Sequence, residues 1–392
     1  MKRSGIIGLL LLACMALSWR PLDNNGVKQQ VAATLRQSIL KEAAWALKQK
    51  PITVTAESSA RSVGAKHDYY SEGDYWWPDD NNPAGPYIQK DGLTNPHNFT
   101  AHRLAMIRFS RIVGALASAY QLTHEEKYIR WALIHLKAWF IDPKTLMNPN
   151  LQFAQAIKGV AIGRGIGIID TIQLMEVVKG VEAMQAKINT GDLKAIKLWF
   201  SVYLNWLTTH QFGKDEMNAK NNHGTCWVMQ AACFALFTGN TEVINFCRDR
   251  YKQVLLPGQM AADGSFPLEL KRTKPYGYSI FNLDAMTTIC QLLSTKKDNL
   301  WEFETADGRS IKKGITYLYP YLEDKSKWPF QHDVMHWDSW PVAQPSLVFG
   351  AVAYENMAWL NTWKTMEHEP ANEEIIRNLP VRHPLIWLND TL

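Results

Sequence analysis

Helical periodicity dominates the pattern of apolar and polar positions along the chain. In residues 28–49, KQQVAATLRQSILKEAAWALKQ, apolar side chains recur at spacings of three and four, which is the period of one helix face. Strand signals are scarce, because the chain lacks runs of alternating β-branched residues joined by hairpin turns. The pattern therefore predicts an all-α fold. Further helices are predicted at 98–121, 126–140, 153–178, 190–210, 223–238, 241–255, 278–294, 309–319 and 346–365.

The predicted helices are of two kinds. Some are amphipathic, such as EKYIRWALIHLKAWF at 126–140, and others are apolar nearly all round, such as GTCWVMQAACFALF at 224–237. A helix that is apolar on all sides is buried, whereas an amphipathic helix keeps one face in water. We therefore expect an incomplete (α/α) toroid or barrel of helical hairpins, with apolar helices inside and amphipathic helices outside. A solenoid of helical repeats is the alternative, but no sequence period of about 34 or 40 residues is present.

The loops between the predicted helices are rich in Gly, Pro, Asp and aromatic residues. The longest, residues 67–97, reads HDYYSEGDYWWPDDNNPAGPYIQKDGLTNPH and shows no helix or strand pattern of its own. Loops of this length are more often functional than idle. No Ser/Gly-rich linker divides the chain, so we expect a single domain from residue 21 to residue 392.

The first 20 residues are predicted to be a secretory signal. MKRSGIIGLLLLACMALSW begins with basic residues, continues with a short apolar run and ends in small residues, and the run is too short to span a membrane. Leu11-Leu12-Ala13-Cys14 resembles a bacterial lipobox and predicts a lipid anchor at Cys14, whereas Ala16-Leu17-Ser18 offers an ordinary cleavage site. Either way we expect a bacterial protein that is periplasmic, anchored at the outer membrane or secreted.

Composition and charge exclude some functions. With 46% hydrophobic and 20% charged residues the chain has the composition of an ordinary globular protein. The 16 Trp, 14 Tyr and 14 Phe are enough both to fill a large core and to stack on sugar rings. The net charge of +5 suits an anionic partner. No Lys/Arg stripe or nucleic-acid motif is present, so we expect no binding to nucleic acid.

Neither the cysteines nor a histidine pair predicts a metal site. The cysteines after the leader are Cys226, Cys233, Cys247 and Cys290. None forms a CxxC motif, and their apolar surroundings predict buried thiols rather than disulfides. His332 and His336 have a spacing that binds zinc on a helix, but Asp333, Pro341 and the lack of a third ligand nearby favour loop histidines. We therefore expect no metal and no cofactor.

Two polar stretches precede predicted inner helices. Asn221, Asn222 and His223 stand directly before GTCWVMQAACFALF. In FPLELKRTKPYGYSIFNLDAM, Arg272 is followed six residues later by Tyr278, which opens another predicted helix. Taken alone, the first stretch can be a helix cap, and the second can be a salt-bridged arginine beside a core tyrosine. In a toroid, however, the ends of the inner helices converge, and an amide, an imidazole, a guanidinium and a phenol then meet in one cavity.

These four groups suit β-elimination in a polymer of 1,4-linked uronic acids. The C5 proton of a uronate lies α to a carboxylate and is barely acidic while that carboxylate is ionised. Donors from Asn and His, with the charge of Arg, would stabilise the developing charge by about 3–4 kcal/mol per donor. A phenol, made more acidic by neighbouring cations, would remove the C5 proton and return it to the leaving O4.

At these residues the chain resembles the alginate-lyase-like polysaccharide lyases, which have an α/α toroid. The resemblance covers most of residues 60–360 and rests on NNHGTCW, LELKRTKPYGYSIFNLDAM, EGDYWWPD, MNPNLQFAQAIKG and GRGIGIIDT in the same order. It implies that Asn222, His223 and Arg272 neutralise the substrate carboxylate and that Tyr278 is both base and acid. His223 is the alternative base for a guluronate-type substrate.

The resemblance also bears on the substrate, without choosing one. Many relatives carry a β-sandwich domain after the toroid, whereas here the sequence after Tyr278 is still helical. That favours the single-domain relatives in polysaccharide lyase family 38 or 5, and hence alginate or glucuronan as substrate. Glucuronate and mannuronate share their configuration at C4 and C5, so elimination geometry does not separate them.

Five further residues are candidates for sugar binding. Tyr75, Trp76 and Trp77 offer stacking faces, although they can instead pack their own loop. His102 and Gln155 are weaker candidates, because either can be a core residue that forms hydrogen bonds.

Two other functions are alternatives. Glu72, Asp74, Asp79 and Asp80 offer the paired carboxylates of an inverting glycoside hydrolase. A non-catalytic glycan-binding surface lipoprotein would use the aromatic loop alone. Such a protein, however, has no need of a phenol beside a carboxylate clamp.

Overall fold

The computed structural model describes residues 24–388, so the predicted leader and Cys14 lie outside the described residues. Successive apolar helices pack side by side as an inner ring, in which α2 contacts α4, α4 contacts α7, α7 contacts α11 and α11 contacts α13. The bounds of the inner helices are α2 Ala101–Thr123, α4 Leu174–Met184, α7 Asn222–Thr238, α11 Pro275–Leu293 and α13 Pro345–Ala353.

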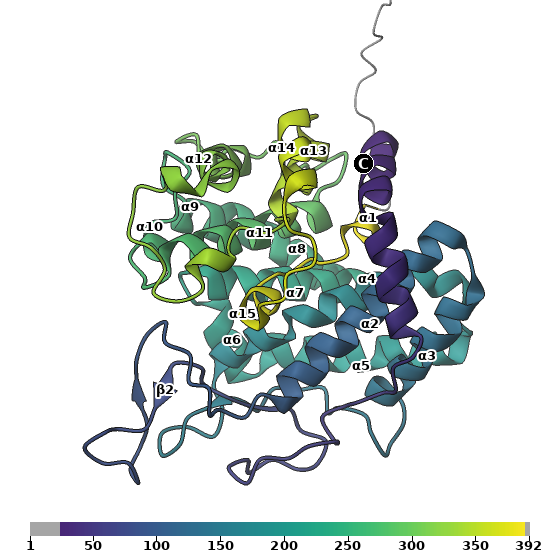
Figure 1. Cartoon of the computed structure of the whole chain (residues 1–392), viewed down its shortest axis with the longest axis vertical. Helices are drawn as coiled ribbons and strands as arrows, with labels where there is room; N and C mark the ends of the chain where they lie inside the picture. The colour runs from purple at the N-terminus through teal and green to yellow at the C-terminus, as the bar shows by residue number, and fades with distance from the viewer. Residues whose placement is uncertain (1–23, 389–392) are drawn as a thin grey trace, which may run out of the picture.

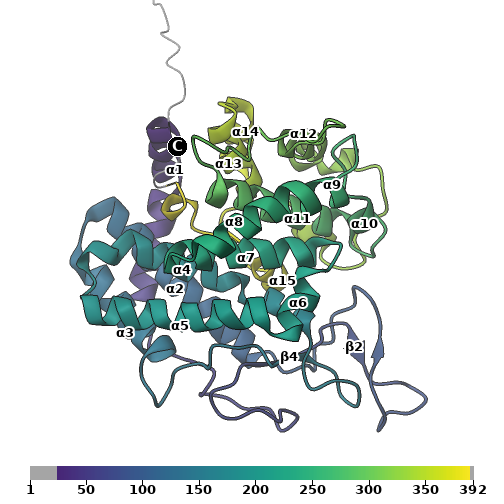
Figure 2. The same ribbon diagram turned by 180° about the vertical axis from the view of Figure 1, so that it is seen from behind.

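Amphipathic helices cover this ring from outside (Figure 1; Figure 2 shows the view from behind). Their bounds are α1 Asn24–Ala46, α3 Glu126–Phe140, α5 Thr190–Thr209, α8 Thr241–Arg250, α12 Ile311–Glu323 and α14 Met357–Thr365. Burial separates the two kinds of helix: every residue from 224 to 235 of α7 is buried, whereas in α8 only Cys247 is. The prediction of an all-α, incomplete (α/α) toroid of helical hairpins is confirmed.

Short elements complete the fold. The short helices are α6 Gln211–Met217, α9 Leu256–Gln259, α10 Pro267–Leu270 and α15 Glu373–Arg377. The strands are β1 Tyr70–Glu72, β2 Trp76–Trp77, β3 Ile88–Gln89 and β4 Phe153–Ala156. β1 pairs with β4 in parallel and β2 with β3 antiparallel, so residues 67–97 are not the element-free loop that the sequence suggests.

The predicted helix at 153–178 is wrong over its first half. Residues 153–156 are β4, a turn follows, and a 3-10 helix at Gly165–Gln173 leads into α4. Glycine is the cause: Gly159 has a positive φ of 74°, and a Cβ on Gly163 would lie 2.0 Å from the carbonyl oxygen of Gln152. A left-handed residue and so close a backbone approach both favour glycine and break a helix.

The predicted helix at 346–365 is two helices. α13 ends at Ala353, Glu355 adopts a positive φ of 52°, and the side chain of Asn356 accepts hydrogen bonds from the first amides of α14. Such an asparagine cap fixes a new helix start. Apolar periodicity continues across the break, which is why the sequence pattern does not show it.

The C-terminal segment fills the ring beside α1 and α2. Its turn at Pro384–Ile386 contacts α1, α2 and α4, and His383 lies between Glu176 of α4 and Glu42 of α1. Burial alone would lower the pKa of His383, but the two carboxylates raise it to about 9. A buried, charged histidine therefore joins the end of the chain to the ring.

This cluster predicts a pH-dependent stability. Because the pKa of His383 is raised above 6.5 in the fold, its contribution is complete below about pH 6.5 and is lost as the pH rises through 9. We expect His383→Gln to destabilise the protein by on the order of 3 kcal/mol at pH 6 and by much less at pH 9.5. Urea unfolding at both pH values measures the difference. The exposed His124, replaced by Asn, is the control; a cost for His383→Gln that is equal at both pH values would contradict the account.

Candidate active site

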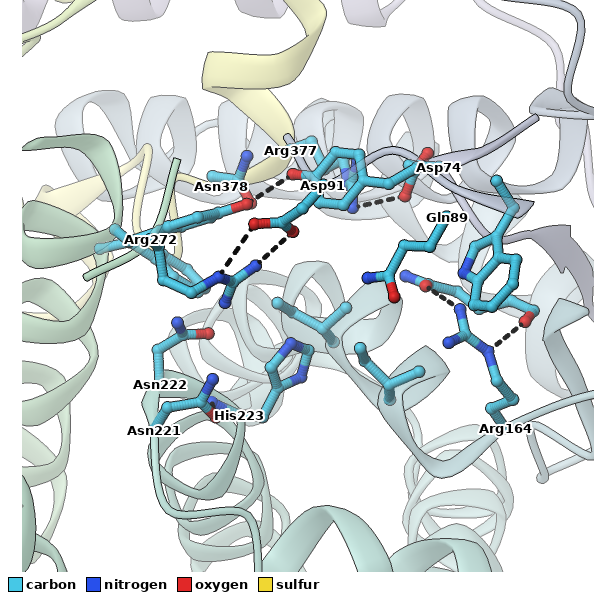
Figure 3. Close-up of a pocket in the computed structure, with 17 residues that line it drawn as sticks. Asp74, Gln89, Asp91, Arg164, Asn221, Asn222, His223, Arg272, Arg377 and Asn378 are labelled. Atoms are coloured by element: carbon cyan, nitrogen blue, oxygen red, sulfur yellow. Dashed lines mark hydrogen bonds and ion pairs between the residues drawn. The ribbon is translucent and has the colours of Figure 1, made fainter. Parts of the chain in front are cut away.

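A polar cavity of about 340 Å³ lies at the N-terminal ends of α7 and α11 (Figure 3). Residues of the 72–91 segment and of α15 line it together with these helix ends. Asn222 and His223 lie on one side, Arg272 with Asp91 lies above them, and Arg164 lies at the opposite end. The structure thus brings Asn222, His223, Arg272 and Tyr278 into one cavity.

The start of α7 positions two of these groups. Asn221 caps the helix by accepting a hydrogen bond from the His223 amide, so Asn222 and His223 form its first turn. A Cβ on the next residue, Gly224, would lie 2.2 Å from the Ala219 carbonyl oxygen, so only glycine lets the preceding turn approach this closely. The helix N-terminus adds partial positive charge to the cavity.

A buried carboxylate holds Asn222. Glu269 accepts hydrogen bonds from the backbone N and from Nδ2 of Asn222, each at 2.8 Å. Burial raises the pKa of Glu269, against the lowering effect of these bonds. An amide nitrogen carries two hydrogens, so the second one on Nδ2 is available to a ligand in the cavity.

A second carboxylate orients His223. Glu216 Oε1 lies 2.7 Å from Nδ1 of the ring, which leaves Nε2 for the cavity, and Figure 3 shows the ring pointing inward. In the protonated ring Nε2 is a donor; in the neutral ring with its proton on Nδ1, Nε2 carries a lone pair. The same geometry therefore serves either a carboxylate donor or a base.

Arg272 is held by Asp91. Its Nη2 and Nε lie 2.9 and 3.3 Å from the two carboxylate oxygens, and Thr273 Oγ1 donates to Asp91 at 3.1 Å. Burial would raise the pKa of Asp91, but the hydrogen bonds and charge of Arg272 lower it. Asp91 therefore stays ionised in the position where an acidic ligand would bind.

Tyr278 lies beside both Arg272 and Tyr75. The Arg272 guanidinium is 4.6 Å from the centre of the Tyr278 ring, and the hydroxyls of Tyr278 and Tyr75 are 2.7 Å apart. Burial raises the pKa of Tyr278 well above its ordinary value, although Arg272 and the Tyr75 hydroxyl lower it. Neighbouring cations therefore act in the expected direction, but burial outweighs them.

Three of the five candidates for sugar binding line the cavity, namely Tyr75, Trp76 and Gln155. Gln155 has a positive φ of 49°, which is rare for a residue with a side chain. Arg164 fixes it by donating to its carbonyl and side-chain oxygens at 2.9 and 3.2 Å, and the same guanidinium lies 5.6 Å from the Trp76 ring. Backbone strain of this kind gathers at functional sites.

The other two candidates, His102 and Trp77, do not line the cavity. His102 is buried, accepts a hydrogen bond from the Tyr70 amide and lies 3.0 Å from the Glu57 carbonyl. Trp77 donates to the Leu93 carbonyl at 2.8 Å. The structure therefore does not place His102 or Trp77 with the other sugar-binding candidates.

The acidic residues of the 72–80 stretch do not form a hydrolase pair. Asp74 is buried between Arg103 and Arg377, each at 2.7 Å, and Glu72 is bonded to Arg61 and Tyr70. Asp79 and Asp80 are not among the cavity residues. An inverting hydrolase needs two carboxylates that face a water molecule, and these residues do not offer them.

Sequence reasoning missed several residues that hold the site, namely Glu216, Glu269, Asp91, Arg164 and Arg377. Glu269 had a signal, since it lies within the LELKRTKPYGY motif three residues before Arg272. Glu216 had none, because α6 is too short to show periodicity.

Other site types receive no support within residues 24–388. No group of three or more His, Cys, Asp and Glu side chains there could hold a metal ion. His332 and His336 lie outside helices, where His332 stacks on Trp337 and His336 contacts Asn372, and the four cysteines are buried free thiols, as predicted. None of the helices described has the length and apolar character needed to cross a membrane.

Comparison with known proteins identifies the class. The fold and the sequence are those of a polysaccharide lyase built on an α/α toroid. The chain belongs to the alginate lyase family, which it matches over residues 53–328. Comparison with curated protein sequences gives no match.

Solved structures agree with this assignment. An alginate lyase from Bacteroides ovatus is 32% identical, covers 93% of this chain and 96% of its own, and superposes with a TM-score of 0.79. Alginate lyase A1-III from Sphingomonas species A1 is 13% identical over 83% of this chain and 89% of its own, with a TM-score of 0.54. A variant of alginate lyase A1-III complexed with tetrasaccharide is 14% identical over 95% and 98%, with a TM-score of 0.59. The latter two show the fold alone.

The Glu269 contacts predict a loss of lyase activity. Glu269→Ala removes both acceptors from Asn222 and lets its amide leave the productive orientation. A misplacement of about 1 Å costs on the order of 100-fold in rate, so we expect kcat/KM to fall by about 10- to 100-fold. Glu269→Gln keeps one acceptor and should lose less. The thermal unfolding midpoint is the control, and unchanged activity in a folded Glu269→Ala protein would contradict the role.

Proposed function

We propose that the protein cleaves 1,4-linked uronate polymers, alginate or glucuronan, by β-elimination. The observation that carries the proposal is the meeting of the Tyr278 phenol and the Arg272 guanidinium, 4.6 Å from ring centre to cation, in a cavity shared with Asn222 and His223. The 32% identical structure is an alginate lyase, and the A1-III variant is complexed with tetrasaccharide, which supports a polysaccharide substrate for this chain.

The substrate carboxylate would bind at the start of α7. The free hydrogen on Asn222 Nδ2, a protonated His223 Nε2 and the Arg272 guanidinium converge on the cavity, where the helix N-terminus already favours an anion. These donors are held by Glu269, Glu216 and Asp91 before substrate arrives. Preorganised donors stabilise developing charge without a cost of reorganisation, at about 3–4 kcal/mol each.

Asp91 would compete with that carboxylate for Arg272. It engages Nε and one terminal nitrogen of the guanidinium, and a guanidinium has five N–H donors. A uronate therefore either uses the remaining donors or displaces Asp91. Displacement of Asp91 requires a ligand that is itself an anion.

Elimination then needs one proton acceptor. The Tyr278 phenolate takes the C5 proton, the C5 electron pair forms the C4–C5 double bond, and the C4–O bond breaks. The phenol returns its proton to the leaving O4, so no water is consumed. For a guluronate, whose C5 proton lies on the opposite face, the neutral His223 ring oriented by Glu216 takes that proton, and the Tyr278 phenol donates its own proton to the leaving O4.

We also propose that the protein acts outside the cytoplasm. The support is the apolar leader that ends near Cys14 in the sequence and the size of the substrate, since a polyuronate is met outside the cell. Lipid anchoring at Cys14 and cleavage at Ala16-Leu17-Ser18 are distinguished by the mass of the mature N-terminus.

The first test uses Tyr278→Phe, which removes one hydroxyl and keeps the ring. We expect wild type to form the conjugated double bond on at least one of polymannuronate, polyguluronate, glucuronan and hyaluronan, and Tyr278→Phe to lose at least about 1,000-fold in kcat with binding retained. Ultraviolet absorbance of the unsaturated product is the measurement. No product from wild type on any polymer, with binding intact, would favour the glycan-binding alternative.

The second test is the pH profile. Because burial raises the pKa of Tyr278, the deprotonated fraction grows tenfold for each pH unit below that pKa. We therefore expect log kcat/KM on a mannuronate or glucuronate polymer to rise with a slope near one beyond about pH 8. An acid limb that levels off far below the range of a tyrosine would instead contradict Tyr278 as the base.

A further inference from the structure

A buried lysine lies behind the two tyrosines of the cavity. The side chain of Lys274 is only 5% exposed, and its Nζ lies 3.2 Å from Glu374 Oε1 and 3.4 Å from the Tyr75 hydroxyl. The same ammonium is 5.0 Å from the centre of the Tyr75 ring. Neither the sequence motifs nor the proposed chemistry gives this cation a role.

The backbone fixes Lys274 close to Tyr278. Lys274 is the N-cap residue of α11, and its carbonyl accepts a hydrogen bond from the Tyr278 amide at 3.0 Å. Residues four apart lie on the same face of a helix. Tyr75 arrives from the loop after β1, and its hydroxyl connects the two: 3.4 Å to Nζ of Lys274 and 2.7 Å to the Tyr278 oxygen.

This chain of contacts favours one direction for the tyrosine–tyrosine hydrogen bond, in which Tyr75 donates. An ammonium has donors and no acceptor, so the Tyr75 oxygen accepts from Lys274. The single Tyr75 hydrogen is then free to point at Tyr278, whose oxygen accepts it. A hydrogen bond donated to a phenol oxygen favours the phenolate, which is the form that removes the C5 proton.

We propose that Lys274 is a positioning residue that lowers the proton affinity of Tyr278 through the hydroxyl of Tyr75. The proposal rests on the proposed function insofar as it concerns catalysis. Lys274 transfers no proton: the C5 proton goes to Tyr278 and returns to O4. Its charge orients the Tyr75 hydroxyl and offsets part of the burial that opposes a phenolate at Tyr278.

Other charged and titratable groups lie around the tyrosine pair, including His223 in the same cavity and His336 beside Lys274. Arg272 and Asp91 lie on the ring side of Tyr278, while Glu374 and Arg377 lie on the side of Tyr75. Burial would raise the pKa of Glu374, but Arg377 and Lys274 lower it to about 2, so it remains ionised. Asp74 and Arg103 extend the same network through Arg377. Glu374 weakens the field of Lys274 but is shared with Arg377.

The test compares Lys274→Met with wild type in the pH profile of kcat/KM. Lys274 carries a unit charge that is about 6 Å from the Tyr278 oxygen, is partly screened and is shared with Glu374. Such a charge changes the pKa of Tyr278 by about one unit. We expect the acid limb of Lys274→Met to move up by about one unit, a tenfold loss at a fixed pH on that limb. Lys274→Arg keeps the positive charge, so its acid limb should lie at the same pH as that of wild type. In a Tyr75→Phe background, Lys274→Met should shift the limb less, because the part of the effect that the Tyr75 hydroxyl carries is absent.

Lys252→Met is the matched control. Lys252 also pairs with a carboxylate, Asp298, and lies 5.5 Å from an aromatic ring, that of Phe303, but it does not line the cavity. The acid limb of the Lys252→Met profile should lie at the same pH as that of wild type. Lys274→Met can lower kcat or stability while its acid limb lies at the same pH as in wild type and in Lys252→Met. In that case Lys274 only anchors α15 to α11, and the proposal is overturned.

A titration without substrate separates this inference from the proposed function. A fluorotyrosine placed at position 278 ionises at lower pH than tyrosine, and fluorine NMR follows its titration in the folded protein. We expect a higher midpoint in the Lys274→Met protein than with Lys274 present. Wild type that cleaves no polyuronate overturns the proposed function. The titration still decides the inference, since an unchanged midpoint overturns it and a raised midpoint supports it.

Discussion

A carboxylate holds each of the three donors that would bind the substrate, and Glu269 and Glu216 are buried. Glu269 holds Asn222, Glu216 holds His223 and Asp91 holds Arg272, while Glu374 pairs with Lys274 behind Tyr75. Polar and charged groups taken out of water are costly unless they are paired. The pairing that offsets the cost of burying these groups also fixes their orientation. Donors with a fixed orientation can stabilise the charge that develops at a substrate carboxylate.

The toroid explains why these pairs meet at one place. The inner helices α7 and α11 are buried along almost their whole length, and the side chains that they offer to the cavity come from near their N-terminal ends. Side by side, the two helices present those first turns to the same cavity. The 72–91 segment then covers the cavity with Tyr75, Trp76 and Asp91, and the Arg103–Asp74–Arg377 network ties that segment to α2 and α15.

The sequence predicted the ring because burial leaves a strong periodic pattern. The apolar runs at 223–238 and 278–294 became α7 and α11, and the polar residues before them became the cavity wall. The sequence pattern did not predict breaks that depend on the backbone conformation of a single residue. The positive φ of Gly159 and of Glu355 interrupts a predicted helix without changing the spacing of its apolar residues. The sequence also did not predict residues that contact the site from distant parts of the chain. Glu216 and Asp91 contact His223 and Arg272 only through the tertiary fold. His102 was a candidate for sugar binding, but both of its ring nitrogens contact backbone groups.

In the proposed complex, one carboxylate of a polyuronate binds Asn222, His223 and Arg272 while C5 of the same sugar faces Tyr278. A crystal structure of Tyr278→Phe with a bound uronate oligosaccharide tests it most directly, because the substrate is held but not cleaved. The account predicts a uronate carboxylate within hydrogen-bond distance of Asn222 Nδ2 and of His223 Nε2, with Arg272 beside it and C5 next to the ring at position 278. An oligosaccharide whose carboxylates all lie away from the start of α7, or whose C4–C5 bond is remote from that ring, would contradict it.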